Sequence, residues 1–351
     1  MSVRRAAALR TLRSMVVFGV PLALLVLLAD ATFAPADQRV VVNFLISLVL
    51  VLAIQTFSGN SGIVSFGHVA FMGVGAYVAA IASIPPAIKD STLPALPSAL
   101  RDLELGFLPA VAAAMLITAV VALAVGVVLT RMEENAMAMA TIGVLVIAFV
   151  VFESWDEVTR GAQGLFGIPA QTTIWWALAF ALAAIAVARL FRESRRGLEL
   201  RASSEDALAA SALGVDVVRL RLLAWVLSGA LMGAGGALWA QYNLAFGPRQ
   251  FFFAQTFAVL AMIVVGGFSS VSGAVIGASV ITIATEVLRR VEDGGADLGP
   301  LHVPGAQGMT PIALALMILL VLRLRRDGLV GLTEIDDALA RRRTRVGRES
   351  T

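Results

Sequence analysis

Long apolar runs dominate this chain and restrict the folds open to it. The 351 residues are 59% hydrophobic and only 15% charged, whereas soluble domains carry roughly a quarter charged residues. Runs of about 18 or more apolar residues are long enough to cross the roughly 30 Å hydrocarbon core of a bilayer as helices. The composition therefore predicts an all-α polytopic membrane protein with little mass outside the bilayer.

The apolar runs predict ten membrane-spanning helices. They cover residues 14–29, 40–57, 62–83, 108–130, 136–152, 173–191, 222–242, 254–270, 272–290 and 309–324. Eight would remain if two glycine-rich segments were re-entrant. The chain then divides into a tail (1–13), one transmembrane domain (14–324) that contains a loop at 192–221, and an Arg-rich C-terminal tail (325–351).

Basic residues are unevenly divided between the two sides of these spans. With the N-terminus inside, the inner segments hold about 20 of the 27 basic residues, as the positive-inside rule requires. Both termini are then cytoplasmic. Ala29-Asp30-Ala31 also has the shape of a signal-peptide cleavage site, but we expect the first run to be a retained membrane helix.

One stretch, residues 58–77, is unusually polar and glycine-rich for a segment between two apolar runs. It contains five glycines, three serines, an Asn and a His. Irregular backbone at membrane depth is tolerated only where protein or a wet cavity surrounds it, and polar groups at that depth are usually functional. The candidates for a transport pathway are Gln55, Asn60, Ser61, Ser65 and His68. The alternative for His68 is a structural hydrogen bond that fixes the break.

The longest inner loop contains a predicted short helix. Ser203-Ser-Glu205-Asp206 has the pattern of a capping box, and Gly214 supplies a stop after residues 207–213. Leu208 and Leu213 have little to pack against there. An apolar patch of this kind favours a docking element, although a loop helix that packs on its own bundle remains an alternative.

Glycines within the later spans predict close helix packing. Gly229, Gly233, Gly235 and Gly236 share one span, and Gly273 and Gly277 form a Gly-x-x-x-Gly pair.

The chain lacks the residues that several kinds of enzyme chemistry require. The chain has no cysteine and one lysine, Lys89, and contains no phosphate-binding Gly-x-x-x-x-Gly-Lys-Ser/Thr loop. No His and acidic residues have metal-ligand spacing, and the basic residues form no nucleic-acid patch. Gly59-Asn-Ser61-Gly resembles the nucleophile motif of rhomboid-type intramembrane proteases, but Ser61 and His68 would lie roughly 10 Å apart on a helix, whereas a dyad needs about 3 Å.

Three segments resemble the LivM-type permease subunits of ABC importers for branched-chain amino acids. Ser65-Phe-Gly-His-Val-Ala-Phe-Met-Gly-Val-Gly-Ala-Tyr77 is similar to the family's Leu-Ser-Leu-Gly-His-Ala-Ala-Phe-Phe-Gly-Ile-Gly-Ala-Tyr. Thr159-Arg-Gly-Ala-Gln-Gly-Leu-Phe-Gly-Ile-Pro169 is similar to an outside loop of the family. The order and spacing of 212–216, 235–239 and 265–273 also follow the family.

The resemblance implies a permease that moves solute by ATP-driven alternating access. The expected partners are a second homologous permease, two cytoplasmic ATPase subunits and an external solute-binding protein, in a bacterial inner membrane. The chain itself would be no enzyme and need no cofactor, because the ATPase partners use the ATP. A secondary transporter or channel without an ATPase is the alternative.

The resemblance also implies roles for two sets of residues. The coupling helix that docks in the ATPase would include Ser203, Glu205, Asp206, Leu208, Ala209, Ala210, Leu213 and Gly214. The binding protein would contact Gly161, Gln163 and Gly164. Gln55 and Ile63 replace the family's usual Asn and Gln, and Asp327 replaces a common Pro. The resemblance therefore implies branched-chain amino acids as the default solutes, with urea and short amides as alternatives.

Overall fold

The computed structural model describes residues 10–294, 296–298, 301–303, 309–325, 328–331 and 334. Helices account for nearly all of the regular structure. They are η1 (Met15–Gly19), α2 (Val20–Thr32), α3 (Pro35–Ser61), α4 (His68–Ser83), α5 (Pro86–Thr92), α6 (Ser98–Arg101), α7 (Phe107–Leu129), α8 (Glu134–Ser154), α9 (Asp156–Thr159), η2 (Gly161–Gln163), α10 (Ile174–Glu193), α11 (Arg195–Glu205), α12 (Ala207–Ala212), α13 (Val217–Asn243), η3 (Pro248–Phe251), α14 (Phe253–Gly266), α15 (Val271–Gly294) and α16 (Met309–Leu324).

The polytopic helical fold predicted from the sequence is confirmed. Within the described residues, eight helices are long and apolar enough to cross a membrane, and α4 with α5, bent by 117°, gives a ninth. The remaining predicted span corresponds to α16, whose apolar part, Ile312–Val321, is shorter. All ten predicted ranges thus contain a helix.

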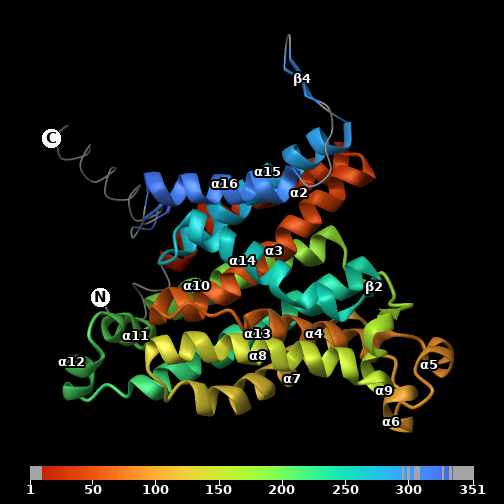
Figure 1. The fold of residues 1–351 in the computed structure, drawn as a ribbon, viewed down its shortest axis with the longest axis horizontal. Coiled ribbons are helices and arrows are strands. Elements are labelled where there is room, and N and C mark those ends of the chain that lie inside the picture. Colours follow the sequence, from red (N-terminus) through yellow and green to blue (C-terminus); the bar gives the residue numbers. More distant parts are fainter. Residues whose placement is uncertain are drawn as a thin grey trace.

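The long helices lie side by side, and their ends form two opposite faces (Figure 1). One end carries α11 and α12, together with the start of η1 and the end of α16. The other carries α5, α6, α9 and the β2 strand. Two antiparallel ribbons complete the fold: β1 (Leu165–Phe166) pairs with β2 (Ala245–Phe246), and β3 (Ala296–Leu298) with β4 (Leu301–Val303).

Helix α13 lies at the centre of the bundle because its glycines admit neighbours on several sides. A Cβ at Gly236 would overlap the Met72 carbonyl oxygen of α4, and one at Gly233 would lie 2.7 Å from Thr118 Oγ1 of α7. A Cβ at Gly235 would lie 2.5 Å from Leu50 of α3. The predicted close packing at these glycines is confirmed.

The Gly-x-x-x-Gly pair packs α15 against α14. A Cβ at Gly273 would lie 2.6 Å from the Gly267 carbonyl oxygen, and one at Gly277 would overlap the Met262 carbonyl oxygen. In lipid, where the hydrophobic effect does not draw helices together, such backbone contact supplies the packing energy.

We predict that Gly236→Ala destabilises the bundle, because the added methyl group meets rigid backbone at Met72. Overpacking of this kind costs about 1–3 kcal/mol. The matched control is Gly143→Ala on α8, where a Cβ meets nothing within 4 Å and helix propensity favours Ala by about 1 kcal/mol. Thermal unfolding in detergent measures both; equal midpoints would contradict the packing analysis.

Candidate functional site

The connection between α3 and α4 differs from the sequence prediction. Helix was expected from residue 62, but α3 continues to Ser61 and α4 begins at His68. With 27 residues, α3 is roughly 40 Å long and spans a bilayer alone. Gly62 and Val64 are exposed, and residues 62–67 form the connection between α3 and α4 at the α11 end of the bundle, where Gly62 lies against Ser204.

Neighbouring helices hold this connection in place. Gly62 ends α3 in the left-handed conformation (φ 75°), and a Cβ there would lie 3.2 Å from Ser204 Cβ of α11. The Phe66 amide donates to Thr141 Oγ1 of α8 over 3.1 Å. A Cβ at Gly67 would lie 2.6 Å from the Thr141 carbonyl oxygen. The connection is therefore gripped between α11 and α8.

The five predicted pathway residues are buried around this connection. Asn60 Nδ2 donates to the Thr56 carbonyl (2.9 Å), and Ser61 Oγ accepts from the Ile63 amide (3.3 Å). Ser65 Oγ lies 2.6 Å from His68 Nδ1. All five side chains, Gln55 included, are at most 1% exposed.

Three aromatic rings surround the His68 side chain. Its ring stacks on Phe57 at a centroid distance of 5.6 Å and meets the edges of Phe71 and Trp225 at 5.9 and 4.7 Å. Because Ser65 holds Nδ1, His68 and Ser61 take different partners, and the dyad required by a protease is not formed.

Several buried polar atoms near the connection have no hydrogen-bond partner among the described residues. They are Gln55 Nε2 and Oε1, Ser58 Oγ, Asn60 Oδ1 and His68 Nε2. Buried polar atoms in folded proteins are nearly always satisfied. Such a concentration at the end of α3 and the start of α4 makes this connection the candidate functional site.

The predicted short helix in the inner loop is present, but its N-cap was predicted wrongly. Ser203 is buried inside α11 and donates to the Leu200 carbonyl. Asp206 is the N-cap of α12 and accepts from the Ala209 amide over 2.9 Å. The cause is that residues 195–205 form a helix of their own, which places Ser203 before the true chain reversal. Gly214 ends the turn with φ 84°.

Helix α12 projects its apolar side chains into the open. Leu208 and Leu213 are 83% and 86% exposed, and Glu205, Ala209 and Gly214 are exposed beside them. Only Ala210 of the predicted docking residues on α12 is buried. The bundle therefore leaves this apolar surface uncovered.

At the opposite end, the glycine-rich loop is a fixed structure. Gly161 and Gly164 have φ values of 53° and 75° and are buried. A Cβ at Gly164 would lie 2.7 Å from the Phe246 carbonyl oxygen, because β1 pairs with β2 here. Of the three predicted contact residues only Gln163 is exposed. Phe166 is also exposed here (47%), although the sequence analysis did not single it out. The alternation of exposed Phe166 with buried Leu165, which is typical of a strand, was the pattern that could have identified it.

Comparison with known proteins decides the family. A family model described as "Branched-chain amino acid transport system / permease component" matches residues 38–324. The chain belongs to this permease family.

Individual relatives match the permease only in part. It is 32% identical over 139 residues to the probable branched-chain amino acid transport permease LivH of Methanocaldococcus jannaschii, which covers 39% of this chain and 41% of that protein. It is 34% identical over 117 residues to LivH of Escherichia coli (33% and 37%) and 32% identical over 93 residues to LivM of the same species (26% and 22%). Each match thus spans less than half of the relative. No solved structure matches the permease.

An ionic cluster at the α11 end of the permease was not found from the sequence. Glu334 is 4% exposed, and its carboxylate accepts from the amides of Val271 and Ser272 (3.0 and 2.9 Å) at the start of α15. The same carboxylate lies 3.0 Å from Arg189 and 2.9 Å from Arg192 of α10. Helix N-termini favour negative charge, so Glu334 ties α10, α15 and the C-terminal segment together.

Backbone contacts reinforce this attachment. The amides of Leu329 and Val330 donate to the carbonyls of Val265 and Gly266 over 2.9 and 3.0 Å. Gly328 (φ 78°) lies against Gly267 with no room for a Cβ. The described part of the C-terminal tail is therefore a fixed element of the bundle.

We predict that Glu334→Gln destabilises the permease by about 3 kcal/mol, since it removes the buried carboxylate that Arg189 and Arg192 share, while the longer contact of Arg189 with Glu193 (3.7 Å) remains. Its control, Glu199→Gln, removes the Arg195 partner in a pair whose arginine is 88% exposed and should cost under about 1 kcal/mol. Thermal unfolding in detergent is the measurement.

The effect of Glu334→Gln should depend on pH. Burial raises the pKa of the Glu334 carboxyl, but Arg189, Arg192 and the hydrogen bonds from Ser272 outweigh burial and hold it below the ordinary 4.5. A lowered acid pKa stabilises the fold fully above the unfolded value, and this stabilisation is lost as pH falls through the folded value. The difference between wild type and variant should therefore be constant above pH 4.5 and shrink below it. A constant difference at every pH would contradict the assignment.

Proposed function

We propose that this permease is the transmembrane subunit of an ATP-driven importer that moves solute by alternating access. The observation that carries the proposal is the uncovered apolar surface of α12, which a cytoplasmic ATPase subunit would bury. Large exposed apolar side chains on a short capped helix are typical of a docking site. The α11 end is then cytoplasmic, in agreement with its Arg-rich segments and the positive-inside rule.

The contacts around the connection suggest how force reaches the membrane. Helix α12 follows directly on α11, and α11 touches Gly62 through Ser204. A displacement of α12 by ATPase closure would therefore act on the junction of α3 and α4. The unpartnered polar atoms of Gln55, Asn60 and His68 lie at this junction, where their partners would change between the two access states.

The remaining parts of the importer follow from the family. A second homologous permease would complete the pathway, two ATPase subunits would hydrolyse ATP, and an external binding protein would deliver solute at the end that carries β1 and β2. Gln163 and Phe166 are the exposed residues there that would meet it. A bacterial inner membrane is the expected location, and branched-chain amino acids are the solute class carried in the relatives' names.

Purification of the tagged chain in mild detergent from its native host, with mass identification of co-purifying proteins, tests the assembly. A second permease and an ATPase subunit are expected. A lone chain or homo-oligomer under several detergents, with solute uptake retained in vesicles without ATP, would overturn the proposal in favour of a secondary transporter or channel.

We predict that Leu208→Ala combined with Leu213→Ala releases the ATPase subunit and reduces uptake at least about tenfold. Two exposed leucines at the centre of an interface fit the roughly 2 kcal/mol or more of interface hot spots. The matched control is Leu100→Ala on α6, where the side chain is 39% exposed at the opposite end. Uptake of labelled leucine and ATPase co-purification are the measurements, and equal loss in the control would contradict docking at α12.

We also predict that Gln55→Met reduces solute uptake without destabilising the fold. Neither polar atom of the buried Gln55 amide has a partner among the described residues, so an apolar side chain of similar length should leave stability unchanged or raise it by about 1 kcal/mol. Uptake should fall severalfold if the amide serves the pathway. Unchanged uptake with higher stability would show that Gln55 is dispensable to transport.

A further inference from the structure

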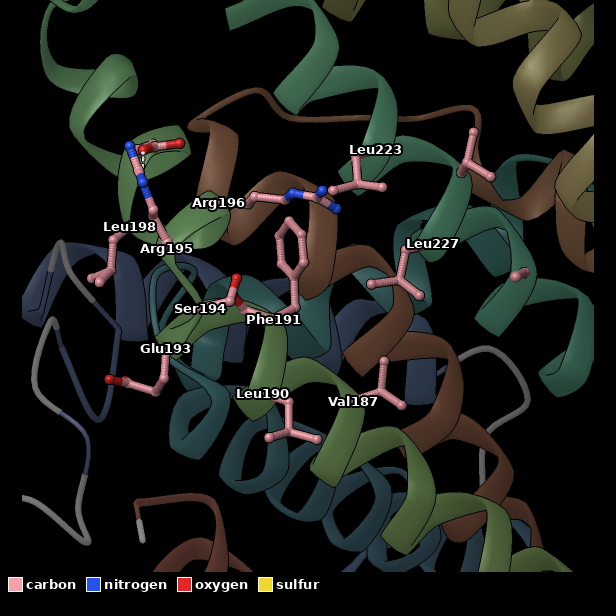
Figure 2. A pocket seen from close by; sticks show the side chains of 13 residues that line it. Val187, Leu190, Phe191, Glu193, Ser194, Arg195, Arg196, Leu198, Leu223 and Leu227 are labelled. Carbon is pink, nitrogen blue, oxygen red and sulfur yellow. Dashed lines mark hydrogen bonds and ion pairs between the residues drawn. The ribbon is translucent and has the colours of Figure 1, made fainter. Parts of the chain in front are cut away.

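A hollow of about 1230 Å³ lies between the ends of α10 and α13, beside the start of α11 (Figure 2). Hydrocarbon side chains form most of its wall, among them Val187, Leu190 and Phe191 of α10 and Leu223, Leu227 and Ala230 of α13. We call it the α10–α13 groove. It exceeds the roughly 300–1,000 Å³ of pockets for drug-sized ligands, and none of the predicted pathway residues lines it.

The groove has a charged mouth. Arg195, Arg196 and Glu199 of α11 line its outer part and also line a second hollow of about 530 Å³ that extends to Asp216 and Arg219. An apolar hollow beside the last two turns of a membrane-spanning helix thus continues into a hollow at the bundle end whose lining mixes charged and apolar side chains. This order, hydrocarbon inward and charge outward, is the order of an acyl chain and its headgroup in the adjoining leaflet.

One positive charge at the mouth lacks a counter-charge. Arg195 pairs with Glu199 over 2.7 Å, and Arg219 pairs with Asp216 over 2.9 Å. Arg196 has no acidic partner within the described part of the chain. In Figure 2 its guanidinium extends over the groove between Phe191 and Leu223, whereas Arg195 points away from the groove toward its own partner.

We propose that the α10–α13 groove binds one phospholipid with an anionic headgroup, whose phosphate pairs with Arg196 and whose acyl chain lies along Leu190, Phe191 and Leu227. Basic pockets between membrane helices on the cytoplasmic side bind such headgroups. Glu193 also lines the groove, but its carboxylate pairs with Arg10 (2.6 Å) and Arg189 (3.7 Å). Among the described residues at the mouth, Arg196 is therefore the cation left to pair with the headgroup phosphate.

The chemistry of the groove favours a lipid over a second protein. Leu190 is 47% exposed and Leu198 43% exposed, so the bundle itself leaves this part of the wall uncovered. A protein partner would have to insert an apolar projection and place a carboxylate at Arg196 at the same depth. An anionic lipid carries both groups in one molecule, and the bilayer presents it there in excess.

The test uses the full chain with its accompanying subunits, delipidated in a zwitterionic detergent and titrated with phosphatidylglycerol while native mass spectrometry counts bound lipid. Arg196→Gln should weaken binding about fivefold, the effect of one basic residue near an anionic membrane surface. Arg195→Gln, the adjacent and equally charged control, should change it less than about twofold. Ala230→Phe, which fills the groove without altering charge, should also reduce the bound lipid.

Three outcomes would overturn the proposal. Equal weakening by Arg195→Gln and Arg196→Gln would mean non-specific attraction to basic surface. Equal binding of phosphatidylcholine would mean that the negative charge of the headgroup does not contribute to binding. A cross-link to a neighbouring permease subunit in native membranes, formed by a photoreactive reagent attached to the thiol of Leu227→Cys, would mean that protein fills the groove. Unfolding midpoints of all variants, measured in the same detergent, must match wild type within error. Arg196→Lys, which keeps the positive charge, should bind the lipid like wild type, and loss of binding in this variant would also contradict the proposal.

Discussion

Close backbone contact along α13 is the constraint on which the rest of the bundle depends. Gly233, Gly235 and Gly236 let α7, α3 and α4 approach one helix from different sides. Trp225, on the same helix, is fully buried and packs on Phe57, Phe71 and His68. The position of the α3–α4 connection, and with it the polar side chains around it, therefore follows from how closely these helices can pack.

The Arg-rich end of the permease concentrates the elements that would transmit force. Glu334 links α10, α15 and the C-terminal segment, α11 touches the connection at Gly62, and α12 stands exposed beyond them. The contacts of Glu334 are buried, whereas Leu208 on α12, where an ATPase would dock, is exposed. A push on α12 would reach α3, α10 and α13, since α11 contacts all three helices. The lipid groove proposed beside α11 would place an anionic lipid against the same moving part.

The sequence predicted particular elements well where local chemistry decided them. The membrane spans, Gly214 as the helix stop and the exposure of Leu208 and Leu213 all follow from apolar length and turn residues. The predictions from sequence were wrong where two local signals competed. Ser203 has the form of an N-cap, yet Asp206 takes that place because α11 continues through Ser203. Residues 62–67 have the form of a break inside a span, yet α3 is long enough to cross the bilayer before they begin.

By itself, the sequence determined that this chain is a polytopic helical membrane protein, because apolar length and backbone hydrogen bonding leave few other folds in a bilayer. It also determined which polar and glycine residues are unusual in that setting. Only the tertiary structure decided which side chains from distant segments lie together. Glu334 pairs with Arg189 and Arg192, which lie far from it in the chain. Arg196 lies beside the groove with no acidic partner among the described residues. No local sequence pattern encodes either arrangement. Their physical basis is the packing of whole helices, which brings charges together or leaves one alone.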